Sequence, residues 1–232
     1  SPVRVHHFRY APTERLHCLG YGRSLERDVR LKKSAPVLIP FYLASGVSSL
    51  ITHHYRERYD IFHAHWVLPS GVIAAVTSML TGVPLGITLH GSDAYIAAKN
   101  SWYGLAARFA FRHAKFVTAN SPDLIHTARK LGATSDATCI VPTGVDPDIF
   151  AIPRTDAVPM ISQLGLNERN QIVLGMGRLV DKKGFAYLVR AIPSIVQEFP
   201  SARFVIAGDG ESLASLRNLV QELGVQDYVI FP

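Results

Sequence analysis

The stretch QIVLGMGRLVDKKGFAYLVRAI, residues 171–192, combines an apolar strand, a short basic loop and the start of a helix. The apolar run ends at Gly177, and we expect the helix to begin near residue 184. The same order repeats downstream, where the expected elements are a strand over 202–208, a helix over 211–223 and a strand over 228–231. Unbroken apolar strands that alternate with helices are typical of a parallel sheet covered on both faces. The pattern predicts an α/β, doubly wound fold with a parallel sheet.

The first 150 residues show the same alternation. Strands are expected over residues 3–8, 60–66, 84–89, 115–119 and 137–141. Helices are expected over about 41–58, 69–81, 102–113 and 122–132. A mixed segment with two prolines follows, so we expect domains over 1–152 and 170–232, joined by a linker and connecting helix over 153–169. The second domain has too few strands and helices to complete a doubly wound sheet, and we therefore expect an incomplete chain.

Composition excludes several classes of protein. The chain has 232 residues, of which 48% are hydrophobic and 18% charged, so it can form a core and is not disordered. Its two cysteines, Cys18 and Cys139, are far apart and form no CxxC motif, which argues against a disulfide scaffold and a structural zinc site. Reduced thiols and a cytoplasmic location are the simplest expectation.

The net charge of +6 comes entirely from the first 150 residues, and Arg23–Lys33 is its most basic segment. Such a half can bind anionic surfaces or acidic ligands, or it can be a solvated face. Two uncharged stretches, 34–52 and 66–89, are long enough to cross a membrane. Prolines and glycines interrupt both, so we expect no transmembrane helix.

The basic loop between the strand and the helix is the sharpest candidate site. A helix that opens at Gly184 presents unpaired N–H groups to an anion. Arg178 adds a planar guanidinium that matches phosphate oxygens, and Lys183 adds a mobile ammonium. Together these groups predict a cradle for a diphosphate, although a solvated basic loop has the same composition.

Nicotinamide binding is disfavoured. The dinucleotide fingerprint requires G-x-G-x-x-G, and Val180 stands where the third glycine should follow Gly175 and Gly177. A second candidate, GDGESL (208–213), has Leu213 at that place. A nicotinamide-dependent oxidoreductase is therefore a weak alternative, and the P-loop pattern is absent from the sequence.

Further polar residues follow other expected strands. TLHGSD (88–93) places His90, Gly91 and Asp93 in a loop, where they can serve a ligand, or where Ser92 and Asp93 cap the next helix while His90 packs. In HAHW (63–66), His63 and His65 point to the same side of a strand, for which we expect a packing role and no metal. In VPTGVDPDIF (141–150), Asp146 and Asp148 are expected to form turns.

These motifs in this order, together with RFVIAGDGE, resemble the retaining glycosyltransferases of family 4, which have the GT-B architecture. The resemblance runs from about residue 60 to the end of the chain. It implies two Rossmann-like domains, the first receiving an acceptor and the second holding a nucleotide-diphosphate sugar. The first domain would lack its first strand and the second would be truncated.

The resemblance also implies roles for single residues. Arg178 and Lys183 would contact the diphosphate of the donor, and His90 would lie beside the transferred sugar with Asp93 nearby. The glycines of the donor site would be Gly177, Gly184, Gly208 and Gly210. The resemblance places the family's glycine-rich loop before residue 3 and its pair of glutamates after Pro232, so we expect the chain as given to be a poor catalyst or none.

The function implied is hexosyl transfer to a hydroxyl acceptor, with retention of configuration and without a metal or other cofactor. The partners implied are a nucleotide-sugar donor and a sugar or lipid-linked acceptor, with peripheral contact of the basic half with the anionic inner face of the membrane. Nucleic acid is not an expected partner. The alternative is a non-catalytic fragment that binds only an acceptor or a partner surface.

Overall fold

The computed structural model describes residues 3–17, 19, 25–27, 30–31, 35–151 and 154–232. The chain divides into two compact units, Ser1–Val145 and Asp146–Pro232. Each unit contains its own parallel sheet and its own hydrophobic core. The α/β class with parallel sheets in two domains is confirmed, and the two units are described separately below.

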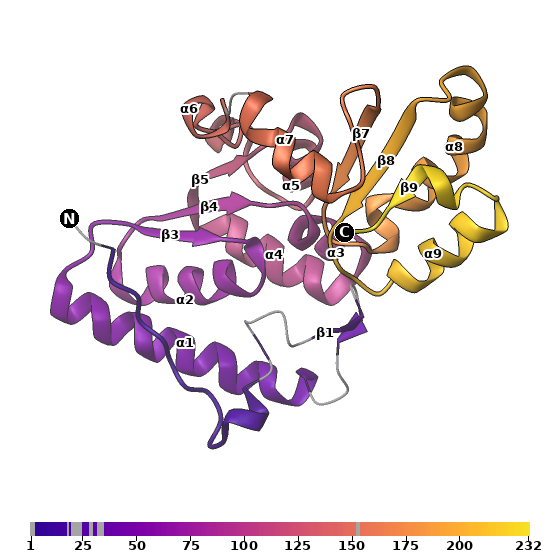
Figure 1. Ribbon diagram of the computed structural model, residues 1–232. Coiled ribbons are helices and arrows are strands. Elements are labelled where there is room, and N and C mark those ends of the chain that lie inside the picture. The colour runs from indigo at the N-terminus through magenta and orange to yellow at the C-terminus, as the bar shows by residue number, and fades with distance from the viewer. Residues whose placement is uncertain (1–2, 18, 20–24, 28–29, 32–34, 152–153) are drawn as a thin grey trace. The chain divides into compact units, whose positions relative to one another are not determined.

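The first unit is built on a four-stranded parallel sheet in the order β3-β4-β5-β6 (Figure 1). The strands are β3 (Phe62–His65), β4 (Leu85–Leu89), β5 (Ala114–Ala119) and β6 (Thr138–Ile140). The helices that connect them are η2 (Val67–Gly71), α2 (Val72–Thr81), α3 (Ser92–Lys99), α4 (Ser101–His113), α5 (Pro122–Lys130) and η3 (Ser135–Ala137). Because each crossover is helical, all four carboxyl ends meet at one edge of the sheet.

The two faces of this sheet differ in chemistry. Phe62 and Ala64 of β3, with the odd-numbered residues of β4, are buried in a core that alanines of α2 and α4 complete. The register pairs His65 with Thr88 and Thr88 with Thr118. Since side chains alternate along a strand, these polar residues share the opposite face. One face therefore supplies the core, and the other carries histidine and threonine.

A long helix, α1 (Ala35–Glu57), precedes β3 and packs along α2. A Cβ at Gly46 would come within 2.6 Å of Ile73 Cδ1, so this glycine permits the close approach of the two helices. The expectation that prolines interrupt this segment is wrong. Pro36 lies in the first turn, where the helix needs no N–H donor, and Pro40 removes one hydrogen bond without ending the helix.

By length and composition, α1 could also cross a membrane, a test that buried helices of globular proteins and signal sequences pass as well. Only 6% of its apolar window is buried within the described structure.

One N-terminal expectation is wrong, and another lies largely outside the described residues. Residues 3–8 form no strand, and Val3 and Val5 are 90% and 72% exposed, because no neighbouring strand pairs with them in the described structure. The basic segment Arg23–Lys33 lies largely outside the described residues. The part described contains a small antiparallel pair, β1 (Leu25–Arg27) and β2 (Arg30–Leu31). A short helix, η1 (Glu14–Leu16), precedes it.

The second unit contains a three-stranded parallel sheet in the order β7-β8-β9. Its strands are β7 (Gln171–Met176), β8 (Ala202–Ala207) and β9 (Val229–Ile230). Its helices are α6 (Pro147–Phe150), α7 (Arg154–Gln163), η4 (Asp181–Lys183), α8 (Phe185–Glu198), α9 (Leu213–Glu222) and η5 (Gln226–Tyr228). Phe204 and Ile206 of β8 pack against Val189 and Ile192 of α8, which fixes the strand–helix–strand unit predicted from the sequence.

The loops after β7 and β8 touch through their backbones. The N–H of Leu179 donates to the Asp209 carbonyl at 2.9 Å, and the N–H of Ser212 donates to the Leu179 carbonyl at 2.9 Å. A Cβ at Gly208 would lie 2.0 Å from the Gly177 carbonyl oxygen, and one at Gly210 would lie 2.3 Å from the Leu179 oxygen. Both glycines are therefore required for the close approach of the two loops.

Replacing Gly210 with alanine should destabilise the second unit by about 3 kcal/mol or more, because the backbone that the methyl group meets cannot rotate away. The matched control is Gly224→Ala. Gly224 also has a positive φ, of +65°, but open space surrounds its Cβ position. Its substitution should cost only about 1 kcal/mol of strain. Urea unfolding of both variants gives the comparison, and equal losses would contradict the backbone contact.

Candidate functional site

Three histidines meet at the carboxyl ends of β3 and β4. The rings of His63 and His65 lie with their centroids 4.8 Å apart, and His65 Nδ1 is 2.8 Å from His90 Nε2. The rings of His65 and His90 are stacked at 27°, with centroids 5.1 Å apart. All three side chains are exposed on the polar face of the sheet. The packing expected for His63 and His65 is confined to contacts among exposed rings, His63 lying 4.8 Å from His65 and 5.8 Å from Phe116, because no core covers that face in the described part of the chain.

Two threonines extend this cluster across the sheet. His63 Nε2 is 2.7 Å from Thr88 Oγ1, and Thr88 Oγ1 is 2.7 Å from Thr118 Oγ1. Neither threonine was predicted from the sequence. Thr88 is the one polar residue of β4, whereas β5 also contains Lys115, and the pairing of the two threonines becomes visible only once the register of the strands is known.

Asp93 connects the loop after β3 with the loop after β4 through hydrogen bonds to their backbones. Its carboxylate is 6% exposed and accepts hydrogen bonds from the backbone N–H groups of Val67 at 2.8 Å, Gly91 at 3.1 Å and His90 at 3.3 Å. These bonds satisfy donors that would otherwise be buried without partners. Of the two readings of this loop, the one in which Ser92 and Asp93 cap the helix is wrong, because the residue before α3 is Gly91 and no side chain caps that helix.

The surroundings of His65 favour its neutral form. Desolvation lowers the pKa of His65 from its ordinary value of 6.5, and the neighbouring His63 and His90 lower this pKa further. A neutral imidazole has one N–H donor and one nitrogen acceptor, so His65 Nδ1 can donate to or accept from His90 Nε2 according to its tautomer.

A tyrosine and a carboxylate lie beside the loop that carries His90. The Tyr95 hydroxyl donates a short hydrogen bond to Asp123 Oδ2, and this bond is the main reason that the pKa of Tyr95 is raised. The Tyr95 ring also comes within 3.9 Å of the Cβ position at Gly91, where φ is +116°. Sequence reasoning missed this pair, because 28 residues separate the partners.

In the second unit, the predicted cationic residues lie in the loop that follows β7. Arg178 comes directly after Gly177, and Lys183 ends the short helix η4; both side chains are exposed. Gly184 takes a left-handed conformation, with φ +73°, and α8 begins at the next residue. Asp181 Oδ1 accepts a hydrogen bond from the Ser212 hydroxyl at 2.9 Å, which ties this loop to the one after β8. The loop thus presents two cations and the N-terminus of a 14-residue helix to solvent.

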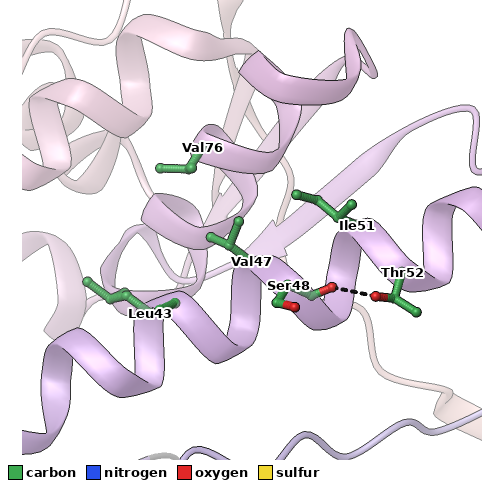
Figure 2. A pocket seen from close by; sticks show the side chains of 7 residues that line it. Leu43, Val47, Ser48, Ile51, Thr52 and Val76 are labelled. Atoms are coloured by element: carbon green, nitrogen blue, oxygen red, sulfur yellow. Dashed lines mark hydrogen bonds between the residues drawn. The ribbon is translucent and has the colours of Figure 1, made fainter.

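A groove on the first unit has a different character. It lies between α1 and α2 and is lined by Leu43, Ala44, Val47, Ser48, Ile51, Thr52 and Val76. Figure 2 shows the Thr52 hydroxyl bonded to the Ser48 carbonyl, at 2.8 Å. No charged side chain lines this groove, so it offers nothing that matches a diphosphate. Among the described residues, no three His, Cys, Asp or Glu side chains cluster closely enough to hold a metal ion.

Two family models match the chain. The model described as Glycosyltransferase Family 4 covers residues 3–149, and the model described as Glycosyl transferases group 1 covers residues 159–232. Their boundary falls within the segment that contains α6 and α7.

Individual proteins agree with these matches. The chain is 31% identical to the putative teichuronic acid biosynthesis glycosyltransferase TuaC of Bacillus subtilis, with 90% of this chain and 56% of that protein covered. It is 26% identical to the N-acetyl-alpha-D-glucosaminyl L-malate synthase of Bacillus anthracis, with 88% and 53% covered. The chain thus spans about half the length of the curated relatives it matches.

Among solved structures, Anabaena HepE in complex with UDP-glucose superposes with a TM-score of 0.68 at 25% identity. The superposition covers 80% of this chain and 50% of that one.

Replacing Asp93 with asparagine should destabilise the first unit by about 2 kcal/mol, because the amide group has one oxygen fewer to accept the buried N–H donors. Asp123→Asn is the matched control, since Asp123 lies at the surface and, among the described residues, its carboxylate accepts a hydrogen bond from the Tyr95 hydroxyl alone. Urea unfolding followed by circular dichroism measures both changes. A loss of stability at Asp93 no larger than that at Asp123 would show that the loops do not depend on this carboxylate.

Proposed function

Because the chain belongs to glycosyltransferase family 4, we propose that its protein transfers a hexosyl group from a nucleotide-diphosphate sugar to a hydroxyl acceptor. Retention of configuration and independence of divalent metals are part of this proposal. The single observation that carries the proposal is the loop after β7, where Arg178, Lys183 and the start of α8 follow one another within eight residues. We assign the acceptor side to residues 1–152, the connection to 153–169 and the donor side to 170–232.

The chemistry of the reaction requires positive charge at the donor. Cleavage of the sugar–phosphate bond leaves growing negative charge on the diphosphate while the anomeric carbon becomes cationic. In this proposal, the Arg178 guanidinium, the Lys183 ammonium and the N–H groups at the start of α8 would neutralise that charge. Preorganised donors of this kind each lower a barrier by about 3 kcal/mol. This loop would therefore supply the charge that a metal ion supplies in other enzymes.

In the same proposal, His90 lies beside the transferred sugar, and Asp93 supports it. The exposed ring of His90 agrees with contact to a ligand. The carboxylate of Asp93 faces backbone N–H groups, so its part in catalysis would be to hold the His90 loop in place. Gly177 and Gly184 shape the donor loop, whereas Gly208 and Gly210 support it from behind through backbone contact.

The alternative function is a non-catalytic fragment that binds an acceptor or a partner surface. This alternative is consistent with the fact that the chain spans about half the length of its relatives. Calorimetric titration of the chain with UDP and with GDP separates the two. Saturable binding supports the donor site, and absence of binding by both nucleotides supports the fragment.

Lys183→Ala should weaken nucleotide-diphosphate binding to the chain at least tenfold and should lower transfer by the full-length enzyme about 100-fold or more, because one cation at the leaving group is lost. Lys182→Ala is the matched control, since it removes the same charge one residue earlier in the sequence. Titration with UDP and GDP, and transfer assays with and without EDTA, give the comparison. Equal effects at the two positions would refute a specific contact with Lys183.

Peripheral contact with an anionic membrane is a further part of the proposal. The exposed face of α4 supports it, because Trp102 and Leu105 are 80% and 56% exposed and Arg108 and Arg112 continue the same face. The helix contains no acidic residue. Apolar and basic side chains on one helix face are typical of interfacial binding.

Arg108→Gln with Arg112→Gln should therefore lower partitioning onto phosphatidylglycerol vesicles about thirtyfold, since each basic residue contributes about 1 kcal/mol near such a surface. Sedimentation with phosphatidylglycerol and with phosphatidylcholine vesicles measures this effect. Tyr187→Ala, at another exposed aromatic side chain, serves as the control. Binding that is absent, or that salt does not weaken, contradicts the proposal.

A further inference from the structure

We propose that His65 is a positioning residue for His90, whose ring it holds in one orientation and whose tautomer it couples to its own, so that His90 Nδ1 is the nitrogen presented to a substrate. The assignment of a substrate to His90 rests on the function proposed above. The positioning itself rests on the contacts of this cluster alone.

The first contact is the hydrogen bond between the two rings. His65 Nδ1 lies 2.8 Å from His90 Nε2, so Nε2 of His90 is occupied. Among the described residues, His90 Nδ1 has no hydrogen-bond partner, and the His90 side chain is exposed. A ligand that approaches the carboxyl end of β4 would therefore meet Nδ1.

Backbone hydrogen bonds fix the positions of the Cα atoms of His65 and His90. His65 pairs with Thr88 in the register of β3 and β4, and the N–H of Trp66 donates to the Thr88 carbonyl at 2.8 Å. The N–H of His90, two residues further, donates to Asp93 Oδ1. Asp93 therefore holds the backbone of His90 and His65 holds its ring, which are two independent attachments.

The His65 ring is itself held on its other side. It lies 4.8 Å from the His63 ring, and His63 is bonded to Thr88 and through it to Thr118. The lowered pKa of His65 favours its neutral form, in which Nδ1 either donates or accepts one hydrogen bond. The His65–His90 hydrogen bond therefore couples the tautomer of His90 to that of His65.

The first test uses the 232-residue chain labelled with ¹⁵N-histidine and needs no substrate. We expect a scalar coupling across the hydrogen bond between His65 Nδ1 and His90 Nε2, and two well-separated nitrogen signals for His90. Absence of the coupling, together with averaged His90 signals, would overturn the proposal without any substitution.

Variants test the same point. His65→Phe keeps a ring of similar size but cannot form the hydrogen bond, and the two nitrogen signals of His90 should converge. His65→Asn places an amide close to the position of Nδ1 and should restore most of the separation. His126→Phe, at an exposed histidine on α5, is the matched control and should leave the His90 signals unchanged. His90 signals in His65→Phe that equal those of the unmodified chain would refute the proposal.

The full-length enzyme gives the functional readout, with UDP-glucose as the donor probe. His65→Phe should lower kcat about 10- to 100-fold while the donor KM stays within about twofold, because the ring orientation and not donor binding is lost. His65→Asn should recover part of kcat. An unchanged kcat would overturn the catalytic part of the inference. Failure of the proposed transferase function would be seen in a different measurement: Lys183→Ala would then bind UDP and GDP as tightly as the unmodified chain.

Discussion

The buried carboxylate of Asp93 is the interaction on which the first unit's site depends. Parallel strands bring their carboxyl ends to one edge of the sheet. The loops that follow these strands contain backbone N–H groups that have no partner within the sheet and need a hydrogen-bond acceptor. Asp93 accepts three such groups, from the ends of both β3 and β4. An ionised carboxylate is a strong acceptor, and its burial is favourable only when its oxygens are paired in this way. Asp93 therefore holds in place the backbone that follows His65 and the loop that carries His90.

In the second unit, the loops that follow the strands are also held in place, but by contacts between their backbones and not by a buried carboxylate. Its two strand-end loops touch backbone to backbone, and Gly208 and Gly210 make this contact possible because they have no Cβ. The Asp181–Ser212 hydrogen bond adds a side-chain tie between the loops. The basic loop is thereby held in one shape while its cations remain exposed. Preorganisation of this kind matters for a charged leaving group, since the loop need not reorganise as charge develops.

The two candidate sites differ in chemistry. The loop after β7 in the second unit carries exposed cations, which suit an anionic group in the proposed reaction. The first unit offers imidazoles and hydroxyls, which can form hydrogen bonds with hydroxyl groups. His65 is the residue that connects structure to chemistry in the first unit, because the same ring is packed by His63 and bonded to His90.

The sequence by itself determined the class of the fold, the alternation of strands and helices from residue 60 onward, and the basic loop before α8. These features depend on local patterns, namely apolar runs, helix-opening residues and glycines at turns. Local patterns gave a wrong prediction at residues 3–8, where apolar and polar residues alternate but no neighbouring strand is present in the described structure to pair with them. They also gave a wrong prediction at α1, which continues through Pro40. Only the tertiary structure decided that His63 and His65 are exposed, that Thr88 and Thr118 join them, and that Asp93 binds backbone rather than capping α3. The reason is physical: partners on neighbouring strands are 25 to 30 residues apart in the chain, and the register that pairs them is set by packing across the whole sheet.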